Sequence, residues 1–297
     1  MLDRLFVLAQ YVLPQILISR LAGKLADSRP PAPVLTAVIR WFIGRYGVNM
    51  NEAADENPAS YGTFNAFFTR ELKPGLRPLA GGSETLVSPV DGTISQLGQV
   101  SDDRVFQAKG QSFSLTELLG GDAERAKPFE GGEFATIYLA PHDYHRIHMP
   151  LAGKLQEMAY VPGRLFSVNP VTAEAVPRLF ARNERVVAIF DTDAGPMAMV
   201  LVGAMIVGSV ETRWSGVVAP TDGKREVTTS DYRHQSPGVR YERGEEMGRF
   251  RLGSTVILVF PKGATRWQEN LQSRDQVRLG QSFGKVMNAQ QETPAPR

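Results

Sequence analysis

The chain has 297 residues, of which 42% are hydrophobic and 22% charged, with a net charge of +2 and no cysteine. This balance is typical of a globular protein with a core, and the length fits one or two domains. The small net charge gives no electrostatic case for nucleic-acid binding, and the lack of cysteine excludes disulfides, thiolate zinc sites and a cysteine nucleophile.

The first stretch of the chain is apolar with a near-helical period. It holds no run of about 20 apolar residues, so a membrane-spanning helix is not expected. Asp3 and the lack of a small-residue cleavage site argue against a signal peptide. Basic residues punctuate the apolar pattern: Arg4, Arg20, Lys24, Arg29, Arg40 and Arg45. The pattern fits a helix lying on anionic lipid and fits equally a helix packed on its own domain.

Further helices are predicted before residue 73. Prolines at 30–33 break the chain ahead of a second amphipathic stretch at 34–48. A short helix is expected over Ser60–Leu72, with Thr63 as its N-cap and an aromatic face. That face consists of Phe64, Phe67 and Phe68.

The sequence pattern changes from helical to β-like after a loop rich in proline and glycine. From about Leu86, short β-like runs alternate with Gly and Pro, and one helical piece is expected over 172–185. The β-like runs are 85–100, 133–141, 185–192, 196–211 and 255–260. The sequence therefore predicts an α+β protein, with a helical N-terminal region on a mainly antiparallel, sandwich-like or barrel-like β domain.

The same change in sequence pattern predicts the domain boundaries. Residues 1–70 form a helical, amphipathic region, and residues 71–287 form the β-rich domain. The last segment, 288–297, is polar and proline-rich, so disorder is expected there.

Three of the four histidines, His142, His145 and His148, lie within seven positions. Imidazole is a common metal ligand, but residues three apart on an extended segment face opposite sides, so one ion could be reached only through a bend. The cluster also fits a surface loop with one structural histidine, or a general base with a second acid–base group.

A Gly-Ser pair, Gly253 and Ser254, directly precedes the predicted strand Thr255–Phe260. Such a pair is common turn punctuation. Ser254 is alternatively a nucleophile that needs a histidine base and an orienting carboxylate, for which Asp91 at a predicted turn is a candidate. The stretch "LGSTV" is not the G-x-S-x-G elbow of α/β-hydrolases, which disfavours a conventional esterase.

Six segments together resemble the phosphatidylserine decarboxylases, and the bacterial membrane-bound branch most closely. They are "TFNAFFTREL", "PVDGTI", "DYHRIHMP", "FSVN", "FARNERV" and "RLGSTV". The likeness runs from Leu2 to Lys285. It implies that the chain cuts its own backbone between Gly253 and Ser254, giving a large chain, 1–253, and a small chain, 254–297.

The resemblance also implies the cofactor and the reaction. Ser254 becomes a covalent pyruvoyl group, which forms a Schiff base with phosphatidylserine and releases CO₂ to give phosphatidylethanolamine. Asp91, His148 and Ser254 form the charge relay of self-cleavage, and His145 assists the decarboxylation. His142 lies outside the family pattern D-Y-H-R-x-H and inherits no role.

A phospholipid substrate favours the membrane reading of the N-terminal region. We therefore expect a peripheral protein on the cytoplasmic face of the cell membrane, in contact with an anionic lipid surface. The two chains are expected to form a heterodimer that dimerises further. Two alternatives stay open: a metal-dependent lipid or phosphoester hydrolase that uses the three clustered histidines, and a non-enzymatic membrane-binding β module.

Overall fold

Helices come first in the computed structural model, which describes residues 2–205, 209–219, 226–251 and 254–287. Three helices of 11 to 15 residues are followed by two short ones. They are α1 (Leu2–Val12), α2 (Gln15–Asp27), α3 (Ala32–Tyr46), the 3₁₀ helix η1 (Met50–Glu52) and α4 (Phe64–Phe68). Prolines before α2 and α3 separate the three, because proline cannot supply the N–H that a continuous helix needs.

The expected cap of α4 is confirmed, whereas its expected end is wrong. The Thr63 hydroxyl accepts a hydrogen bond from the Ala66 N–H at 3.0 Å. The helix ends at Phe68 and not at Leu72, because Leu72 pairs as an isolated β-bridge with Ala53.

Strands dominate from residue 85 onward. The first nine are β1 (Thr85–Val87), β2 (Gly92–Gln99), β3 (Arg104–Ala108), β4 (Gln111–Ser114), β5 (Glu133–Leu139), β6 (Arg146–His148), β7 (Gly153–Val161), β8 (Arg185–Thr192) and β9 (Gly195–Val202). They are followed by β10 (Val210–Thr212), β11 (Gly216–Ala219), β12 (Thr228–Asp231), β13 (Arg240–Tyr241), β14 (Glu246–Phe250), β15 (Ser254–Phe260), β16 (Thr265–Trp267), β17 (Gln276–Val277) and β18 (Ser282–Val286).

Short helices interrupt the strands. They are α5 (Leu115–Leu118), α6 (Ala123–Ala126), η2 (Lys127–Phe129), α7 (Pro170–Ala175) and α8 (Leu179–Arg182). The single helical piece expected over 172–185 is thus two helices. Pro177 lies between them, and Arg178 adopts the left-handed region with φ 56°.

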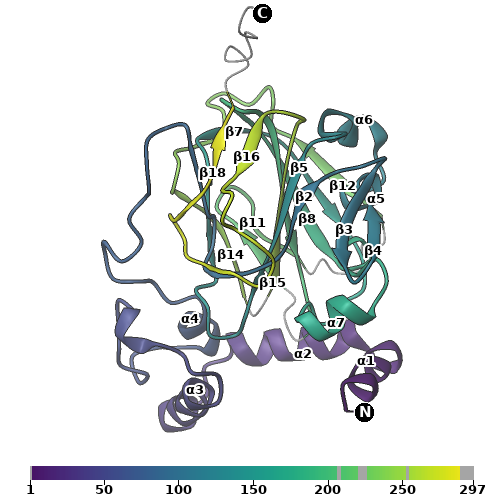
Figure 1. Cartoon of the computed structure of the whole chain (residues 1–297). Coiled ribbons are helices and arrows are strands. Elements are labelled where there is room, and N and C mark those ends of the chain that lie inside the picture. The colour runs from purple at the N-terminus through teal and green to yellow at the C-terminus, as the bar shows by residue number, and fades with distance from the viewer. Residues whose placement is uncertain (1, 206–208, 220–225, 252–253, 288–297) are drawn as a thin grey trace, which may run out of the picture.

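The described residues form an antiparallel β domain of four sheets (Figure 1). The largest has nine strands in the order β12-β7-β8-β9-β15-β5-β2-β17, with β13 beside β7. Smaller sheets have the orders β11-β10-β14-β6, β1-β18-β16 and β3-β4. The predicted α+β class with a mainly antiparallel β domain is confirmed, and the largest sheet is open, with β12 and β17 at its edges.

Two apolar cores lie on the two faces of the large sheet. In β15, Ile257 and Val259 belong to one core, together with aromatic residues of α4. Val256, Leu258 and Phe260 belong to the other, together with residues of the smaller sheets. Since both faces are covered, all seven residues of β15 are buried, which explains its uninterrupted apolar run.

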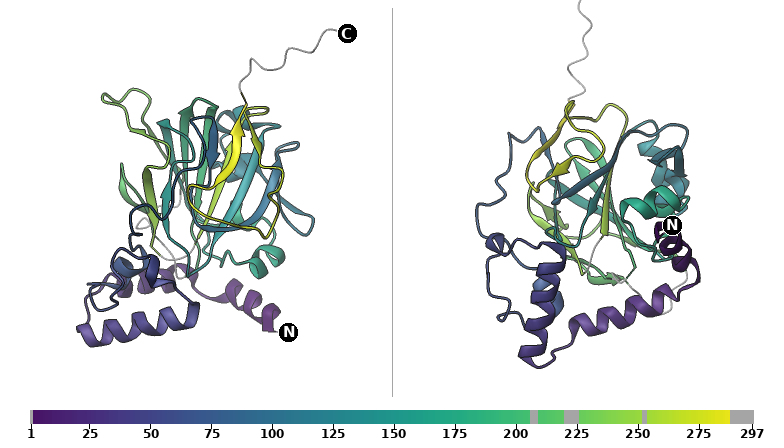
Figure 2. Two further views of the ribbon diagram at one scale, coloured as in Figure 1. Left: turned by 60° about the vertical axis from the view of Figure 1, so that its left-hand side comes forward. Right: turned by 60° about the horizontal axis from the view of Figure 1, so that its bottom comes forward.

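The N-terminal helices lie along one end of the β domain, as Figure 2 shows from two sides. Two buried glutamines fix α1 and α2 there. Gln10 Oε1 accepts from the Ser167 N–H at 2.8 Å, and Gln15 Oε1 accepts from the Leu165 N–H at 2.9 Å. The helices are thus docked on their own domain through polar side chains.

Much of the apolar surface of these helices stays exposed. The exposed large residues are Leu5, Phe6, Leu8, Tyr11, Val12, Leu13, Ile16, Leu17, Leu21, Leu25, Val34, Val38, Trp41 and Tyr46, here called the apolar apron. Among the described residues, no single helix is long and apolar enough to cross a membrane. The bent pair Asp3–Val12 and Gln15–Asp27 passes that test of length and composition together, with an angle of 94° between the helices.

Candidate active site

Ser254 is the first residue of β15 and lies in the interior of the large sheet. It is paired with Leu139, the last residue of β5, and it is fully buried. Its hydroxyl has no hydrogen-bond partner among the described residues. An unpaired buried hydroxyl costs about 1–3 kcal/mol, so such a group invites a functional explanation. Gly253, the other half of the expected cleavage site, lies outside the described residues.

The segment after β5 brings two histidines to this end of the sheet. Because β5 and β15 are antiparallel, the chain that leaves Leu139 starts where β15 begins. The Phe250 N–H, from the end of β14, donates to the His145 carbonyl at 2.9 Å. The His145 segment thus leaves from the strand that pairs with β15 and is hydrogen-bonded to the end of β14.

His145 is enclosed by protein. Its side chain is fully buried, and its ring lies 4.1 Å from the Phe68 ring, centroid to centroid. Nδ1 donates to the Asp143 carbonyl at 2.9 Å, which leaves Nε2 as the unprotonated nitrogen, without a partner among the described residues. Burial lowers the pKa of His145 to about 3, so the imidazole is neutral at physiological pH.

His148 has a different set of partners. Its Nδ1 donates to the Gly244 carbonyl at 2.8 Å, and its Nε2 accepts from the Tyr144 hydroxyl at 3.2 Å. A backbone carbonyl therefore fixes the tautomer and leaves the lone pair on Nε2. Burial lowers the pKa of His148, against the opposing charges of Glu246 and Asp91.

Asp91 lies at the same end of the sheet, just before β2. Thr93 of β2 pairs with Tyr138 of β5, so the strands that carry Asp91 and Ser254 flank β5, about 10 Å apart at ordinary strand spacing. Gly92 allows this approach, because a Cβ there would lie 2.5 Å from the Tyr138 carbonyl oxygen.

The expected hydrogen bond between Asp91 and His148 is not formed. Instead, Asp91 pairs with Arg77, with Nε–Oδ1 at 3.0 Å and Nη2–Oδ2 at 2.6 Å, and its Oδ1 accepts from the Leu279 N–H at 2.8 Å. Arg77 also donates to Glu52 at 2.5 Å. The Asp91 carboxylate pairs with the Arg77 guanidinium, which offers two donors, whereas His148 Nδ1 donates to a backbone carbonyl.

Sequence reasoning missed Arg77 and Glu52. Arg77 lies in the stretch of prolines and glycines that predicted a loop, and Glu52 lies in a turn of 3₁₀ helix. Neither position carries a periodic or motif signal, since their importance comes only from contacts over 14 and 25 residues of chain.

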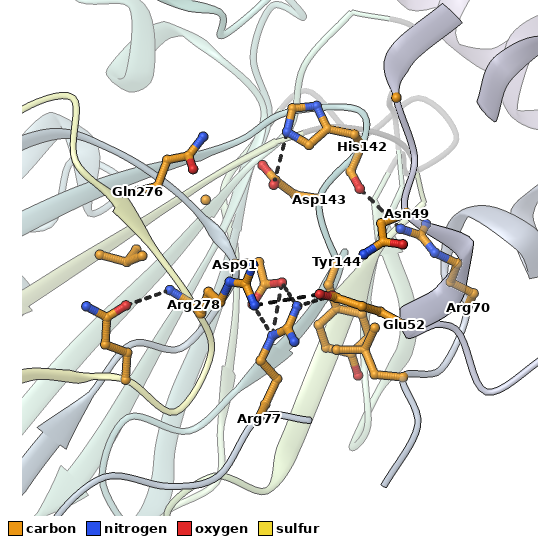
Figure 3. Close-up of a pocket in the computed structure, with 15 residues that line it drawn as sticks. Asn49, Glu52, Arg70, Arg77, Asp91, His142, Asp143, Tyr144, Gln276 and Arg278 are labelled. Atoms are coloured by element: carbon orange, nitrogen blue, oxygen red, sulfur yellow. Dashed lines mark hydrogen bonds and ion pairs between the residues drawn. The ribbon is translucent and has the colours of Figure 1, made fainter. Parts of the chain in front are cut away.

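Two cavities adjoin these groups. One of about 380 Å³ is lined by Asp91, Glu52 and Asp143, and it is drawn in Figure 3. A second, also of about 380 Å³, is lined by His148 and Glu246 among others. The two share a wall, made by Leu72, Arg77 and Tyr144.

The metal-hydrolase alternative needs three converging imidazoles. His142 lies 3.5 Å from the Asp143 carboxylate, whereas His145 and His148 each donate Nδ1 to a different backbone carbonyl. Within the described ranges, no group of three His, Asp or Glu side chains is arranged to hold a metal ion. The ligand geometry of that alternative is therefore not present in this part of the chain.

The start of β15 lies close to the N-terminal helices. Arg251, three residues before Ser254, pairs with Asp27 at the end of α2, at 3.3 Å. Asp27 also accepts from Asn65 of α4 at 2.8 Å, and α4 carries the Phe68 ring that covers His145. The candidate site and the apolar apron thus share one end of the molecule.

Comparisons with known proteins give relatives over nearly the whole chain. Residues 64–285 match the family model described as phosphatidylserine decarboxylase, and residues 5–47 match one described as PSD. A curated protein from Marinobacter nauticus, named phosphatidylserine decarboxylase proenzyme, is 69% identical over 96% of this chain and 99% of its own length. Proteins of the same name from Hahella chejuensis and Bordetella avium are 59% and 58% identical, over 96% and 99% of this chain and 95% and 98% of their own lengths. The chain belongs to the phosphatidylserine decarboxylase family.

Proposed function

We propose that the chain is a proenzyme that cuts itself between Gly253 and Ser254 and then decarboxylates phosphatidylserine to phosphatidylethanolamine. The relatives named phosphatidylserine decarboxylase proenzyme support both the substrate and the processing. The observation that carries the proposal is the Ser254 hydroxyl, fully buried and without a partner in the described structure, at the first residue of a central strand.

Self-cleavage needs only groups of the chain to break the backbone, and water enters in the last step. Ser254 Oγ adds to the Gly253 carbonyl carbon, the C–N bond breaks, and an ester and a free amine result. Elimination then removes the Cα proton of residue 254 and breaks its Cβ–O bond, which releases the Gly253 carboxylate and leaves dehydroalanine at 254. Water converts the dehydroalanine to a pyruvoyl group and ammonia.

His148 is the base assigned to this cleavage. Its Nε2 holds the lone pair, because Nδ1–H is committed to the Gly244 carbonyl. Burial keeps its pKa below the ordinary value, so the neutral form is populated at physiological pH. The Asp91 charge acts on His148 across the wall that the two cavities share.

The surroundings of Ser254 fit a small neutral group. The side chain is fully buried, and among the described residues no charged group is hydrogen-bonded to its hydroxyl. A ketone at this position supplies an electrophile for the substrate amine and an electron sink for the pair left by CO₂. His145 stays neutral and offers Nε2 to hold or move a proton, and the Phe68 ring packs against its imidazole.

The apolar apron supports a peripheral membrane location on the cytoplasmic face. Exposed basic residues flank it at Arg4, Lys24, Arg29, Arg40 and Arg45, which favours an anionic lipid surface. A phospholipid head group reaching His145 and Ser254 would enter from this end of the molecule.

The experiment is a comparison of the wild-type chain with Ser254→Ala on a denaturing gel and by intact mass. We expect wild type to give fragments 1–253 and 254–297, the second short of ammonia, and to release CO₂ from phosphatidylserine vesicles. Ser254→Ala should stay one uncut, inactive chain, whereas Ser101→Ala, an exposed serine, should behave as wild type. Cleavage of Ser254→Ala at the same bond, or a wild type that stays uncut and inactive, would contradict the proposal.

A further inference from the structure

Four segments of the chain meet at the Asp91 carboxylate. Glu52 comes from η1, Arg77 from the loop between α4 and β1, and Leu279 from the segment before β18. Figure 3 shows Arg77 between Asp91 and Glu52, with hydrogen bonds to both. We call Glu52, Arg77, Asp91 and the Leu279 N–H the Asp91 clamp.

The clamp occupies both oxygens of Asp91. Arg77 Nε lies 3.0 Å from Oδ1 and 3.2 Å from Oδ2, Arg77 Nη2 lies 2.6 Å from Oδ2, and the Leu279 N–H reaches Oδ1. The side chains of Arg77 and Asp91 are only 7% and 11% exposed. A paired, charge-assisted arrangement shielded from water holds the carboxylate in one orientation.

The clamp also separates Asp91 from the base it is expected to serve. Asp91 lines one cavity, His148 lines the other, and Arg77 stands in the wall between them. The position of Arg77 therefore decides both where the Asp91 oxygens point and how much of their negative charge reaches His148.

We propose that Arg77 is a positioning residue for self-cleavage, which holds Asp91 in place and moderates its charge toward His148. This inference rests on the proposed function. Arg77 touches neither Ser254 nor the substrate in this assignment; it acts through Asp91. Glu52 has a supporting part, since it accepts from the same Arg77 Nη2 that donates to Asp91.

The electrostatic signature follows from the groups around His148. The titratable and charged side chains that line its cavity or act on it are Glu71, Lys73, Arg77, Asp91, Tyr144, Arg146, Arg213 and Glu246. Removing the Arg77 charge leaves Asp91 without its cation, whereas Glu52 keeps Arg278 at 3.6 Å; the uncompensated charge of Asp91 favours the imidazolium. Arg77→Gln should therefore raise the pKa of His148, and Glu52→Gln or Asp91→Asn should lower it.

The first measurement is the rate of self-cleavage of the full-length proenzyme across pH. Arg77→Gln should slow cleavage about tenfold, because a carboxylate displaced by a fraction of an ångström loses its alignment. It should also move the acid limb of the rate profile to higher pH. Arg77→Lys should recover part of the rate, since lysine keeps the charge but not the two-donor geometry.

A matched control is available on the surface. Arg233 pairs with Asp231 through the same atoms, with Nε at 3.0 and 3.1 Å and Nη2 at 2.7 Å, but both side chains are about half exposed. Arg233→Gln removes an equivalent pair away from the site. It should leave both the cleavage rate and the pH profile unchanged.

The second measurement does not depend on cleavage. In the Ser254→Ala chain, the pKa of His148 is titrated by NMR, with and without Arg77→Gln, Glu52→Gln and Asp91→Asn; the four histidines of the sequence keep the spectrum simple. An upward shift with Arg77→Gln that shrinks when Asp91→Asn is also present supports the proposal. Unchanged or faster cleavage in Arg77→Gln, or slower cleavage with an unmoved His148 pKa, overturns it and shows a structural role at most.

Failure of the inference and failure of the proposed function remain distinguishable. If Ser254→Ala is cut like wild type, the proposed function fails whatever Arg77 does. If Ser254→Ala blocks cleavage and Arg77→Gln changes neither rate nor pKa, only the inference fails. Should Arg77→Gln not fold, Glu52→Gln decides the question through the downward shift it is expected to produce.

Discussion

His145 and His148 are three residues apart, yet their surroundings differ. His145 is fully buried against Phe68, and its Nε2 has no partner among the described residues, whereas His148 lines a cavity and accepts a hydrogen bond from Tyr144. A buried neutral imidazole suits substrate handling, and one that lines a cavity and feels the charges of Glu246 and Asp91 suits proton transfer in cleavage. The assignment of separate roles remains a prediction.

Substitution separates the two histidines. His148→Ala should block self-cleavage and leave the chain intact, because it removes the base assigned to this step. His145→Ala should allow cleavage but lose at least a hundredfold in CO₂ release, a typical cost for a lost acid–base group. Gel analysis and CO₂ release on the same samples test this, and equal cleavage defects in both variants would refute the division.

The depressed pKa of His145 predicts a pH-dependent stability. The unfolded chain binds a proton at His145 below about pH 6.5, whereas the folded chain does so only near pH 3. The stability that His145 provides by staying neutral is thus full above pH 6.5 and decreases as the pH falls. Between pH 6.5 and 5 the loss from this one group is about 1.5 kcal/mol.

Urea unfolding of the uncut Ser254→Ala chain at the two pH values measures this loss. Adding His145→Asn should reduce the pH dependence of the unfolding free energy by about that amount. His234→Asn, at an exposed histidine, should not reduce it. An undiminished dependence in His145→Asn would mean that His145 titrates normally in the folded chain.

At the scale of elements, α1 and α2 combine a docking side that holds buried glutamines with the exposed apolar apron, whereas the docking side of α3 is apolar. Gln10 and Gln15 hold the domain side, so substitutions on the apron should spare the fold. Leu21→Glu and Leu25→Glu, at side chains 54% and 72% exposed, should each weaken binding to anionic vesicles about tenfold. Vesicle co-sedimentation measures the effect, and Phe106→Glu on β3 is the control; equal losses in all three would dissociate binding from the apron.

Single strands were more predictable from sequence than their arrangement. The runs 185–192 and 255–260 match β8 and β15 almost to the residue, because strands buried on both faces carry continuous apolar letters. The helix expected over 172–185 is divided at Pro177, because proline interrupts a helix even where the spacing of apolar residues predicts one. The tail 288–297, expected to be disordered, lies outside the described residues.

The candidate site was only partly predictable. A sequence pattern can nominate Ser254, His145, His148 and Asp91, but it cannot say which partner each will choose. Arg77 reaches Asp91 because the fold brings the loop before β1 against the segment before β2, a tertiary event without a local signature. The hydrogen bond from His148 to the Gly244 carbonyl could not be predicted from sequence either, since every residue has a backbone carbonyl.

At the scale of the whole molecule, the segment 254–297 is held to the remainder of the chain by strand pairing. Its strands β15, β17 and β18 pair with β5 and β9, with β2 and with β1, all on the large-chain side of the expected cut. The two chains should therefore co-elute in gel filtration after cleavage and separate only in denaturant. Release of the small chain in native buffer would contradict this expectation.

The central place of β15 also constrains how such a protein can be made. A strand with neighbours on both sides and apolar cores above and below cannot be added to a finished sheet from outside. If the chain is cut before Ser254 as proposed, we expect it to be continuous while it folds and to be divided only afterwards. Expressed separately, residues 1–253 would form a sheet that lacks its central strand, and residues 254–297 would be an exposed hydrophobic peptide. Folding of one chain before cleavage avoids both problems.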